Sequence, residues 1–133
     1  MAKIVFTNGC FDILHRGHIE LLKYCRTFGY VIVGLNSDES TRQLKGNGRP
    51  FNTQEDRKLF LESLRYVDEI HIFDEKTPLN LIKELEPDII VKGGDYSSDE
   101  VVGSELAEVK IFNFVEGYST SAIINSLKED QDV

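Results

Sequence analysis

The stretch "KIVFTNGCFDILHRGHIELLKYCRTFGYVIVGLN", from Lys3 to Asn36, decides the fold. It opens with "KIVF" (Lys3–Phe6), an apolar run typical of a strand. It closes with "YVIVGLN" (Tyr30–Asn36), a continuous apolar run of the kind that is buried on both faces of a parallel sheet. Between them, "HIELLKYCRTFG" places apolar residues at helical spacing and ends at Gly29, a helix stop. This order of strand, helix and strand predicts two parallel strands joined by a right-handed crossover.

The remainder of the chain continues the alternation. Further strands are expected at Glu69–Phe73, Asp88–Val91 and Val109–Phe114, the first of them at an edge. Further helices are expected at residues 54–64, 79–85 and 119–127, with N-caps at Thr53, Thr77 and Ser119. The first of these helices should bury Phe60, Leu61 and Leu64. Together the patterns predict an α/β fold with a doubly wound parallel sheet, in a single domain over residues 1–128, and a frayed acidic tail at residues 129–133.

The composition excludes some classes of partner. The 133 residues carry a net charge of −8, which argues against nucleic acid because phosphate contacts need a basic surface. A small anionic ligand needs only a local positive patch. The two cysteines, Cys10 and Cys25, have no paired spacing, so a reducing, cytoplasmic location is expected. We expect no secretory leader and no contact with a membrane, since no apolar run approaches the roughly 20 residues that span a bilayer.

Three unusual stretches each follow a predicted strand. They are "NGCFDILHRGH" after the first strand, "KGGDY" after the strand at Asp88–Val91, and "EGYSTS" after the strand at Val109–Phe114. The carboxyl ends of parallel strands meet at one edge of a sheet, and ligands bind in the crevice there. The three positions therefore predict a functional cleft.

The first of these stretches has the features of an anion site. His15 and His18 lie three residues apart, so both imidazoles can lie on one face of a helix. Gly17 lets a ligand approach the backbone, and the helix N-terminus offers unpaired N–H groups. The spacing fits a phosphate site, a metal pair or ordinary capping histidines; zinc is disfavoured because no usual third ligand lies nearby in the sequence.

The motif "HRGH", preceded by "GCFDILH", resembles the HxGH signature of the nucleotidyltransferase superfamily. The resemblance continues through "RQLKGNGRPFN", "EDRKLFLESLRYVDEI", "PDIIVKGGDY" and "NFVEGYSTSAII", which look like the nucleotidyltransferase domain of bacterial heptose-phosphate adenylyltransferase (ADP-heptose synthase). Glycerol-3-phosphate cytidylyltransferase is a more distant relative. The resemblance implies a Rossmann-like sheet in the order 3-2-1-4-5. It also implies transfer of a nucleotidyl group from a nucleoside triphosphate to a sugar phosphate, with release of pyrophosphate.

The resemblance also gives roles to side chains. His15 and His18 would hold phosphates and stabilise charge at the reacting phosphorus, and Lys45, in the polar loop at Lys45–Asn52, would close over the triphosphate. A phosphate monoester has a second pKa of about 6 and is already an anionic nucleophile, so no general base is required. The other candidates for nucleotide or phosphate binding are Asn8, Gly9, Phe11, Asp12, Gly17, Arg49, Arg57, Lys92, Gly93, Asp95, Glu116, Ser119 and Thr120.

Several candidates have a second interpretation. Lys45 could be a solvated surface lysine, and Ser119 could be an N-cap only. Arg57 could form a surface ion pair with Glu55 or Asp56. Asp12 could orient an imidazole or help to hold Mg²⁺ through water. Mg²⁺ is the expected cofactor, carried by the triphosphate and water rather than by a dedicated protein cage.

The choice of nucleotide rests on departures from the related families. Val115 stands where the glycerol-phosphate cytidylyltransferases carry an arginine, which favours ATP over CTP. The heptose enzymes lack that arginine too, although Ser121 replaces their second threonine. The favoured substrates are ATP and a sugar 1-phosphate, with heptose 1-phosphate first. A CTP-dependent enzyme of the glycerol-3-phosphate type and a non-catalytic nucleotide sensor are the alternatives. Relatives are often dimers, and "LRYVDEIHIF" offers apolar residues for a possible homodimer.

Overall fold

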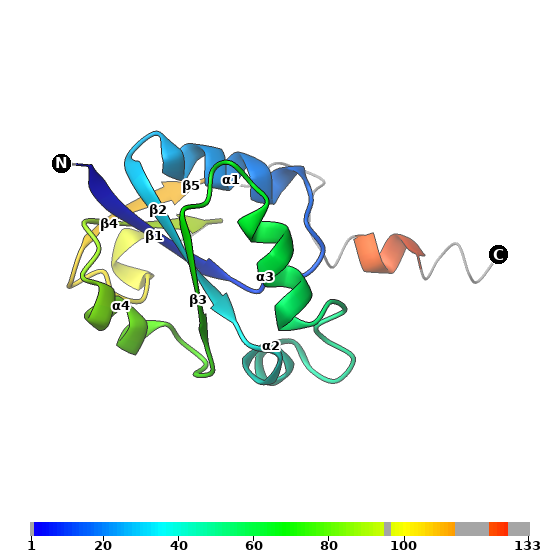
Figure 1. Ribbon diagram of the computed structural model, residues 1–133. Coiled ribbons are helices and arrows are strands. Elements are labelled where there is room, and N and C mark those ends of the chain that lie inside the picture. Colours follow the sequence, from blue (N-terminus) through cyan, green and yellow to red (C-terminus); the bar gives the residue numbers. More distant parts are fainter. Residues whose placement is uncertain (1, 95–96, 114–122, 128–133) are drawn as a thin grey trace.

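The computed structural model describes residues 2–94, 97–113 and 123–127. Within them, five strands form one parallel sheet in the order β3-β2-β1-β4-β5 (Figure 1), which confirms the predicted α/β, Rossmann-like fold and its strand order. The strands are β1 (Lys3–Gly9), β2 (Gly29–Asn36), β3 (Glu69–Phe73), β4 (Ile89–Gly93) and β5 (Glu108–Phe112). The labelled helices are α1 (Arg16–Arg26), α2 (Asp38–Lys45), α3 (Gln54–Glu62), α4 (Leu79–Leu85) and the 3₁₀ turn η1 (Ser98–Glu100). Residues 123–127 are also helical and fall within the helix predicted at 119–127, the rest of which lies outside the described residues. The predicted tail at residues 129–133 lies outside the described residues.

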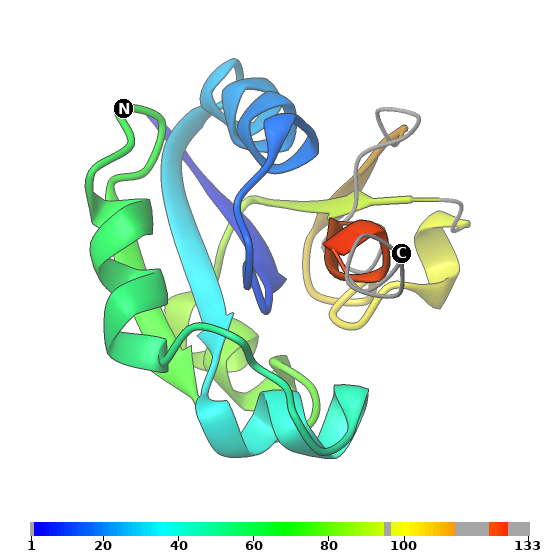
Figure 2. The same cartoon turned by 90° about the vertical axis from the view of Figure 1, so that its right-hand side faces the viewer.

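Different helices cover the two faces of the sheet (Figures 1 and 2). Successive strand residues point to opposite faces, so Val5 and its neighbour Phe6 belong to different apolar clusters. On the Val5 face, α1 contributes Leu22 and α3 contributes Leu61. On the Phe6 face, α4 contributes Ile82, which packs with Val101 from the segment after η1. The sheet is therefore buried on both sides, as the continuous apolar runs predict.

The central position of β1 determines where a ligand can bind. β1 pairs with β2 on one side and with β4 on the other, and both pairs are parallel. The chain runs from β1 through β2 to β3 on one side and then crosses to β4 on the other side of β1, so the strand order reverses there and a crevice is expected beyond the carboxyl end of β1. Figure 2 looks toward this end of β1, with α1 at the top of the view and α2 at the bottom.

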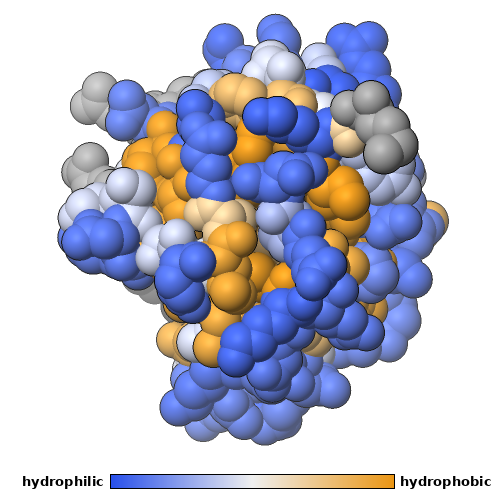
Figure 3. All heavy atoms as spheres, turned by 90° about the vertical axis from the view of Figure 1, so that its left-hand side faces the viewer, coloured by the Kyte–Doolittle hydropathy of each residue, from blue (hydrophilic) through white to orange (hydrophobic). Residues whose placement is uncertain are grey.

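The opposite side of the molecule faces away from the carboxyl end of β1. Figure 3 shows that hydrophilic side chains cover much of this face, with apolar patches between them. In the part of the chain that the structure describes, no helix is both long and apolar enough to cross a membrane.

Some local predictions were wrong. Gly29 does not stop α1, which ends at Arg26; instead Gly29 begins β2 with φ 154°. A Cβ on Gly29 would lie 2.2 Å from the Lys3 carbonyl oxygen, so the close approach of β1 requires glycine there. Pro78, not Thr77, is the N-cap of α4, and no side chain caps it. Phe60 is 43% exposed rather than buried. The N-cap of α3 is Thr53, as predicted, and its hydroxyl accepts the Asp56 N–H.

Candidate functional site

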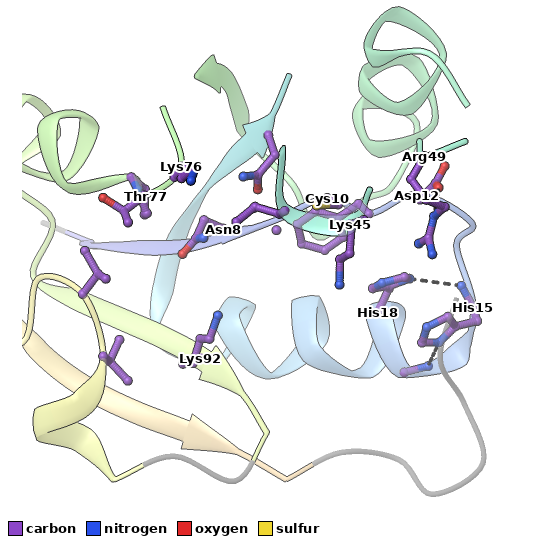
Figure 4. A pocket seen from close by; sticks show the side chains of 18 of the residues that line it. Asn8, Cys10, Asp12, His15, His18, Lys45, Arg49, Lys76, Thr77 and Lys92 are labelled. Carbon is purple, nitrogen blue, oxygen red and sulfur yellow. Dashed lines mark hydrogen bonds and ion pairs between the residues drawn. The ribbon is translucent and has the colours of Figure 1, made fainter. Parts of the chain in front are cut away.

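A pocket of about 510 Å³ lies at the carboxyl end of β1 (Figure 4). Its walls come from the turn between β1 and α1, the end of α2 and the loop after it, the β3–α4 connection, β4, and the segment at 100–102. Ten of the residues predicted from the sequence line it. They are Asn8, Gly9, Phe11, Asp12, Gly17, His15, His18, Lys45, Arg49 and Lys92.

The two histidines cap the helix that carries them. His15 is the N-cap of α1, and its Nδ1 accepts the Gly17 N–H at 3.0 Å. The His15 N–H donates in turn to Nδ1 of His18 at 3.3 Å. The rings are stacked, with centroids 3.9 Å apart (Figure 4). Capping and ligand binding, which were alternatives in the sequence, are thus compatible, because the cap uses only one nitrogen of each ring.

This hydrogen bonding assigns the tautomer of both imidazoles. A nitrogen that accepts an N–H carries no proton, so each neutral ring holds its proton on Nε2. Burial lowers the pKa of His18 to about 4, and the neighbouring His15 contributes to the same shift. Burial also lowers the pKa of His15. Near neutral pH both rings are therefore neutral hydrogen-bond donors from Nε2.

The lowered pKa of His18 predicts a pH-dependent stability. An unfolded histidine has a pKa of 6.5 and the folded His18 a pKa of about 4, so the unfolded state binds more protons in between. The free energy of unfolding should fall as the pH drops through this window, by on the order of 2 kcal/mol from His18. Urea unfolding of the wild type and His18→Gln at pH 7.5, 6.5, 5.5 and 4.5 measures this, and the variant should show the smaller decrease. Parallel curves would contradict the assignment.

The turn before the histidines adopts an unusual backbone conformation. Phe11 has φ +46°, in the left-handed region that bulky residues rarely occupy. Its ring is buried against the core and lies 5.2 Å from the His18 ring. A Cβ on Gly9 would lie 3.2 Å from the Phe11 ring, so a small residue is favoured at Gly9. Phe11 therefore helps to fix the position of His18.

Basic side chains from three other elements face the same space. Lys45 ends α2, Lys92 lies on β4, and Lys76 lies in the β3–α4 connection (Figure 4). Burial lowers the pKa of Lys92, and repulsion from Lys45 lowers it further. Two ammonium groups that repel each other across a cavity form a site for an anion. The local charge is thus basic, although the net charge of the chain is −8.

The Asp12 carboxylate is hydrogen-bonded to the loop at residues 46–52, a contact that neither role predicted for it includes. The side chain is 1% exposed, and its carboxylate accepts the N–H groups of Phe51 and Asn52 at 2.7 and 2.8 Å. It also pairs with Arg49 at 3.2 Å. Asn52 returns a hydrogen bond from its amide to the Asp12 carbonyl at 2.7 Å. Asp12 therefore fastens the end of the 46–52 loop to the turn that carries the histidines.

Two predicted site residues are not among those that line the pocket. Arg57 is fully buried, and neither Arg57 nor Gly93 lines the pocket. The guanidinium of Arg57 binds backbone carbonyls and Asp38, so both predictions for it, a phosphate contact and an ion pair with Glu55 or Asp56, are corrected. The register of α3 explains the difference, because Arg57 lies one turn before Leu61 on the buried side of the helix.

Other candidates cannot be placed, and nine of the residues that line the pocket were not predicted, among them two polar ones after β3. Asp95, Glu116, Ser119 and Thr120 lie outside the described residues. Lys76 and Thr77 were not among the candidates, although they follow β3, whose carboxyl end meets the same edge of the sheet. Applying the same rule to every parallel strand would have found them. In the described ranges, no cluster of three or more His, Cys, Asp or Glu side chains could hold a metal ion.

The fold and the pocket define a class of protein, a Rossmann-like domain with a basic anion site at the switch point of its sheet. The family model of cytidylyltransferase-like proteins matches residues 6–126, and the chain belongs to this family. It is 57% identical over 128 residues to a bifunctional protein HldE of Wolinella succinogenes, and 55% identical over 128 residues to one of Helicobacter pylori. Each match covers 95% of this chain, which spans only 27% and 28% of the length of these relatives.

Solved structures resemble the fold. A lipopolysaccharide core biosynthesis protein from Thermoplasma volcanium is 29% identical, with a TM-score of 0.71 over 88% of this chain and 98% of that one. A pantothenate synthetase from Thermus thermophilus is 20% identical with a TM-score of 0.57, over 85% of this chain and 56% of that one, and shows the fold alone.

Proposed function

We propose that this chain transfers AMP from ATP to a sugar 1-phosphate, most simply heptose 1-phosphate, and releases pyrophosphate. The observation that carries the proposal is the pair of stacked, neutral imidazoles facing Lys45 and Lys92 across one pocket. An oxygen of the sugar phosphate attacks the α-phosphorus of ATP, a new P–O bond forms, and the bond to the pyrophosphate oxygen breaks. The attacking oxygen is anionic already, so the protein needs only to position the groups and neutralise their charge.

The side chains of the pocket can supply both the positioning and the charge neutralisation that this reaction needs. The Nε2–H groups of His15 and His18 can donate to oxygens of the reacting phosphate without carrying a charge of their own. Lys45 supplies a mobile positive charge for the leaving pyrophosphate, and it ends a helix that adjoins the Gly46–Gly48 turn. ATP is favoured over CTP by the absence of an arginine at Val115 and by the similarity to the bifunctional proteins HldE.

Magnesium fits the site as part of the nucleotide. The Asp12 carboxylate is occupied by two backbone N–H groups and Arg49, which leaves it little capacity to bind a cation. A triphosphate carries Mg²⁺ on its own oxygens and water, where the ion neutralises charge on the leaving group. The cationic side chains of the pocket then bind the remaining phosphate charge.

The end of the pocket away from the histidines suits the sugar hydroxyl groups of the acceptor, because the acceptor phosphate itself must lie beside the α-phosphorus at the imidazoles in order to attack it. Lys76 and Thr77 lie there, separated from the imidazoles by Asn8 and Lys45 (Figure 4). Lys76→Met is therefore expected to raise the KM for the sugar phosphate about 10-fold, while the KM for ATP changes less than about 2-fold. Steady-state kinetics with each substrate varied in turn measures this. The control is Lys83→Met, an exposed lysine on α4 outside the pocket, which should leave both constants unchanged.

The test of the function is pyrophosphate release from the purified chain with Mg²⁺. ATP and CTP should each be paired with heptose 1-phosphate, other sugar 1-phosphates and glycerol 3-phosphate. Selective release with ATP and a sugar 1-phosphate supports the proposal. Selective release with CTP and glycerol 3-phosphate supports the second enzymatic candidate, and nucleotide binding without release from any pair supports a sensor.

A further inference from the structure

Arg57 is the largest side chain that is fully buried among the described residues. Its Nε donates to the Asn52 carbonyl at 3.0 Å. One terminal nitrogen donates to the carbonyls of Cys10 and Asn36 at 2.7 and 2.8 Å. The other donates to the Asp38 carboxylate at 2.9 Å. A buried guanidinium that donates four hydrogen bonds is well satisfied, since arginine has five N–H donors in a fixed planar arrangement.

The four acceptors belong to segments that build the pocket. Cys10 lies in the turn that leads to the histidines, and Asn36 ends β2. Asp38 is the first residue of α2, the helix that ends in Lys45, and Asn52 closes the loop that follows Lys45. Arg57 therefore contacts the histidine-bearing turn and both ends of the segment that carries Lys45.

A second buried side chain, Asp12, also links the histidine-bearing turn to the loop that follows Lys45. Asp12 accepts the N–H groups of Phe51 and Asn52, while Arg57 donates to the carbonyls of Asn52 and Cys10. Asp12, from the histidine-bearing turn, and Arg57, from α3, thus bind opposite polar groups at the end of the loop that follows Lys45. Of the contacts of these two side chains, only the Arg57–Asp38 ion pair reaches the start of α2.

We infer that Arg57 is a positioning residue, which holds Lys45 at a fixed place relative to His15 and His18 through its ion pair with Asp38. This inference rests on the proposed function for its kinetic readout. Lysine cannot replace arginine in this role, because a single ammonium group cannot reach all four acceptors that lie around the planar guanidinium group. Removing the Asp38 side chain should loosen the first turn of α2 and the lysine at its end, while the three carbonyl contacts of Arg57 and the hydrogen bonds of Ser40 to Asn36 and Glu75 remain.

The test compares Asp38→Ala with Glu39→Ala. Both changes remove a carboxylate from the first turn of α2, but the Glu39 side chain pairs with Arg42 and Gln43 on the surface of the same helix. We expect Asp38→Ala to lower kcat/KM for ATP about 10-fold and Glu39→Ala less than about 2-fold. In a Lys45→Ala background, Asp38→Ala should have less than about a 2-fold effect, because the residue it positions is gone. Effects of Asp38→Ala and Lys45→Ala that multiply would overturn the inference.

A second readout needs no turnover. Amide hydrogen exchange of the full chain should become at least about 5-fold faster over residues 38–49 in Asp38→Ala and in Arg57→Lys, but not in Glu39→Ala. Unchanged exchange in Asp38→Ala would also overturn the inference. If the wild type releases no pyrophosphate from any substrate pair, the proposed function fails, and the exchange experiment alone decides whether Arg57 positions the segment.

Discussion

Replacing His18 with glutamine is expected to lower kcat for pyrophosphate release about 10³-fold, the loss typical for a donor aimed at charge that develops in a transition state. The change removes the Nε2–H that faces the pocket. It need not unfold the helix, because glutamine at the third helical position is a natural partner in a capping box and can still accept the His15 N–H. The expected result is therefore a large kinetic loss with a small change in stability.

The control for this variant is His71→Gln, the same substitution at a surface histidine on β3. Rates should be measured at saturating ATP and sugar phosphate at pH 7.5, together with urea unfolding. His71→Gln should retain the wild-type rate within about 2-fold. A His18→Gln variant with more than a tenth of the wild-type rate would remove His18 from the proposed chemistry.

Replacing Asp12 with alanine is expected to reduce the free energy of unfolding by about 3–5 kcal/mol. The Asp12 carboxylate is almost fully buried and accepts two backbone N–H groups and the Arg49 guanidinium. Without it, all three donors lose their acceptor, and a buried donor without a partner is costly. Activity should fall as well, since the loop after Lys45 would lose its attachment to the histidine-bearing turn.

Urea unfolding monitored by circular dichroism measures this effect. Asp74→Ala is the matched control, because Asp74 is exposed at the end of β3, and its removal should change the free energy by less than about 0.5 kcal/mol. Asp12→Asn should lie between the two, since an amide retains one acceptor oxygen. A loss below about 1 kcal/mol in Asp12→Ala would show that water or other groups satisfy these donors.

The sheet was predictable from the sequence because its strands are buried on both faces. Residues 31–35 and 89–91 are apolar without interruption, and such runs identify strands of a parallel sheet. Helix α2 was missed for the opposite reason. Its buried residues are Ser40 and Thr41, so it has no apolar stripe to reveal a helical period. Its only signals are the N-cap Ser37 and the acidic first turn.

The site was predictable where residues are neighbours in the chain and less so elsewhere. His15, Gly17 and His18 share one turn of backbone, so their spacing gives their arrangement. The direction of Arg57 depends on carbonyls of Cys10, Asn36 and Asn52, which come together only in the folded chain. Helical spacing cannot show whether an arginine near a basic pocket points into it or into the core.

The pairing of β1 with β4 has a consequence for folding kinetics. Val5 pairs with Ile89, and the Thr7 hydroxyl donates to the Val91 carbonyl, so these contacts close a loop of 84 residues. Strands β1, β2 and β3 can associate through shorter crossovers, without β4. Because long-range parallel pairing raises the contact order and slows folding, docking of β4 onto β1 should be the late step. Until then one edge of β1 stays open, although in the native sheet it is the central strand.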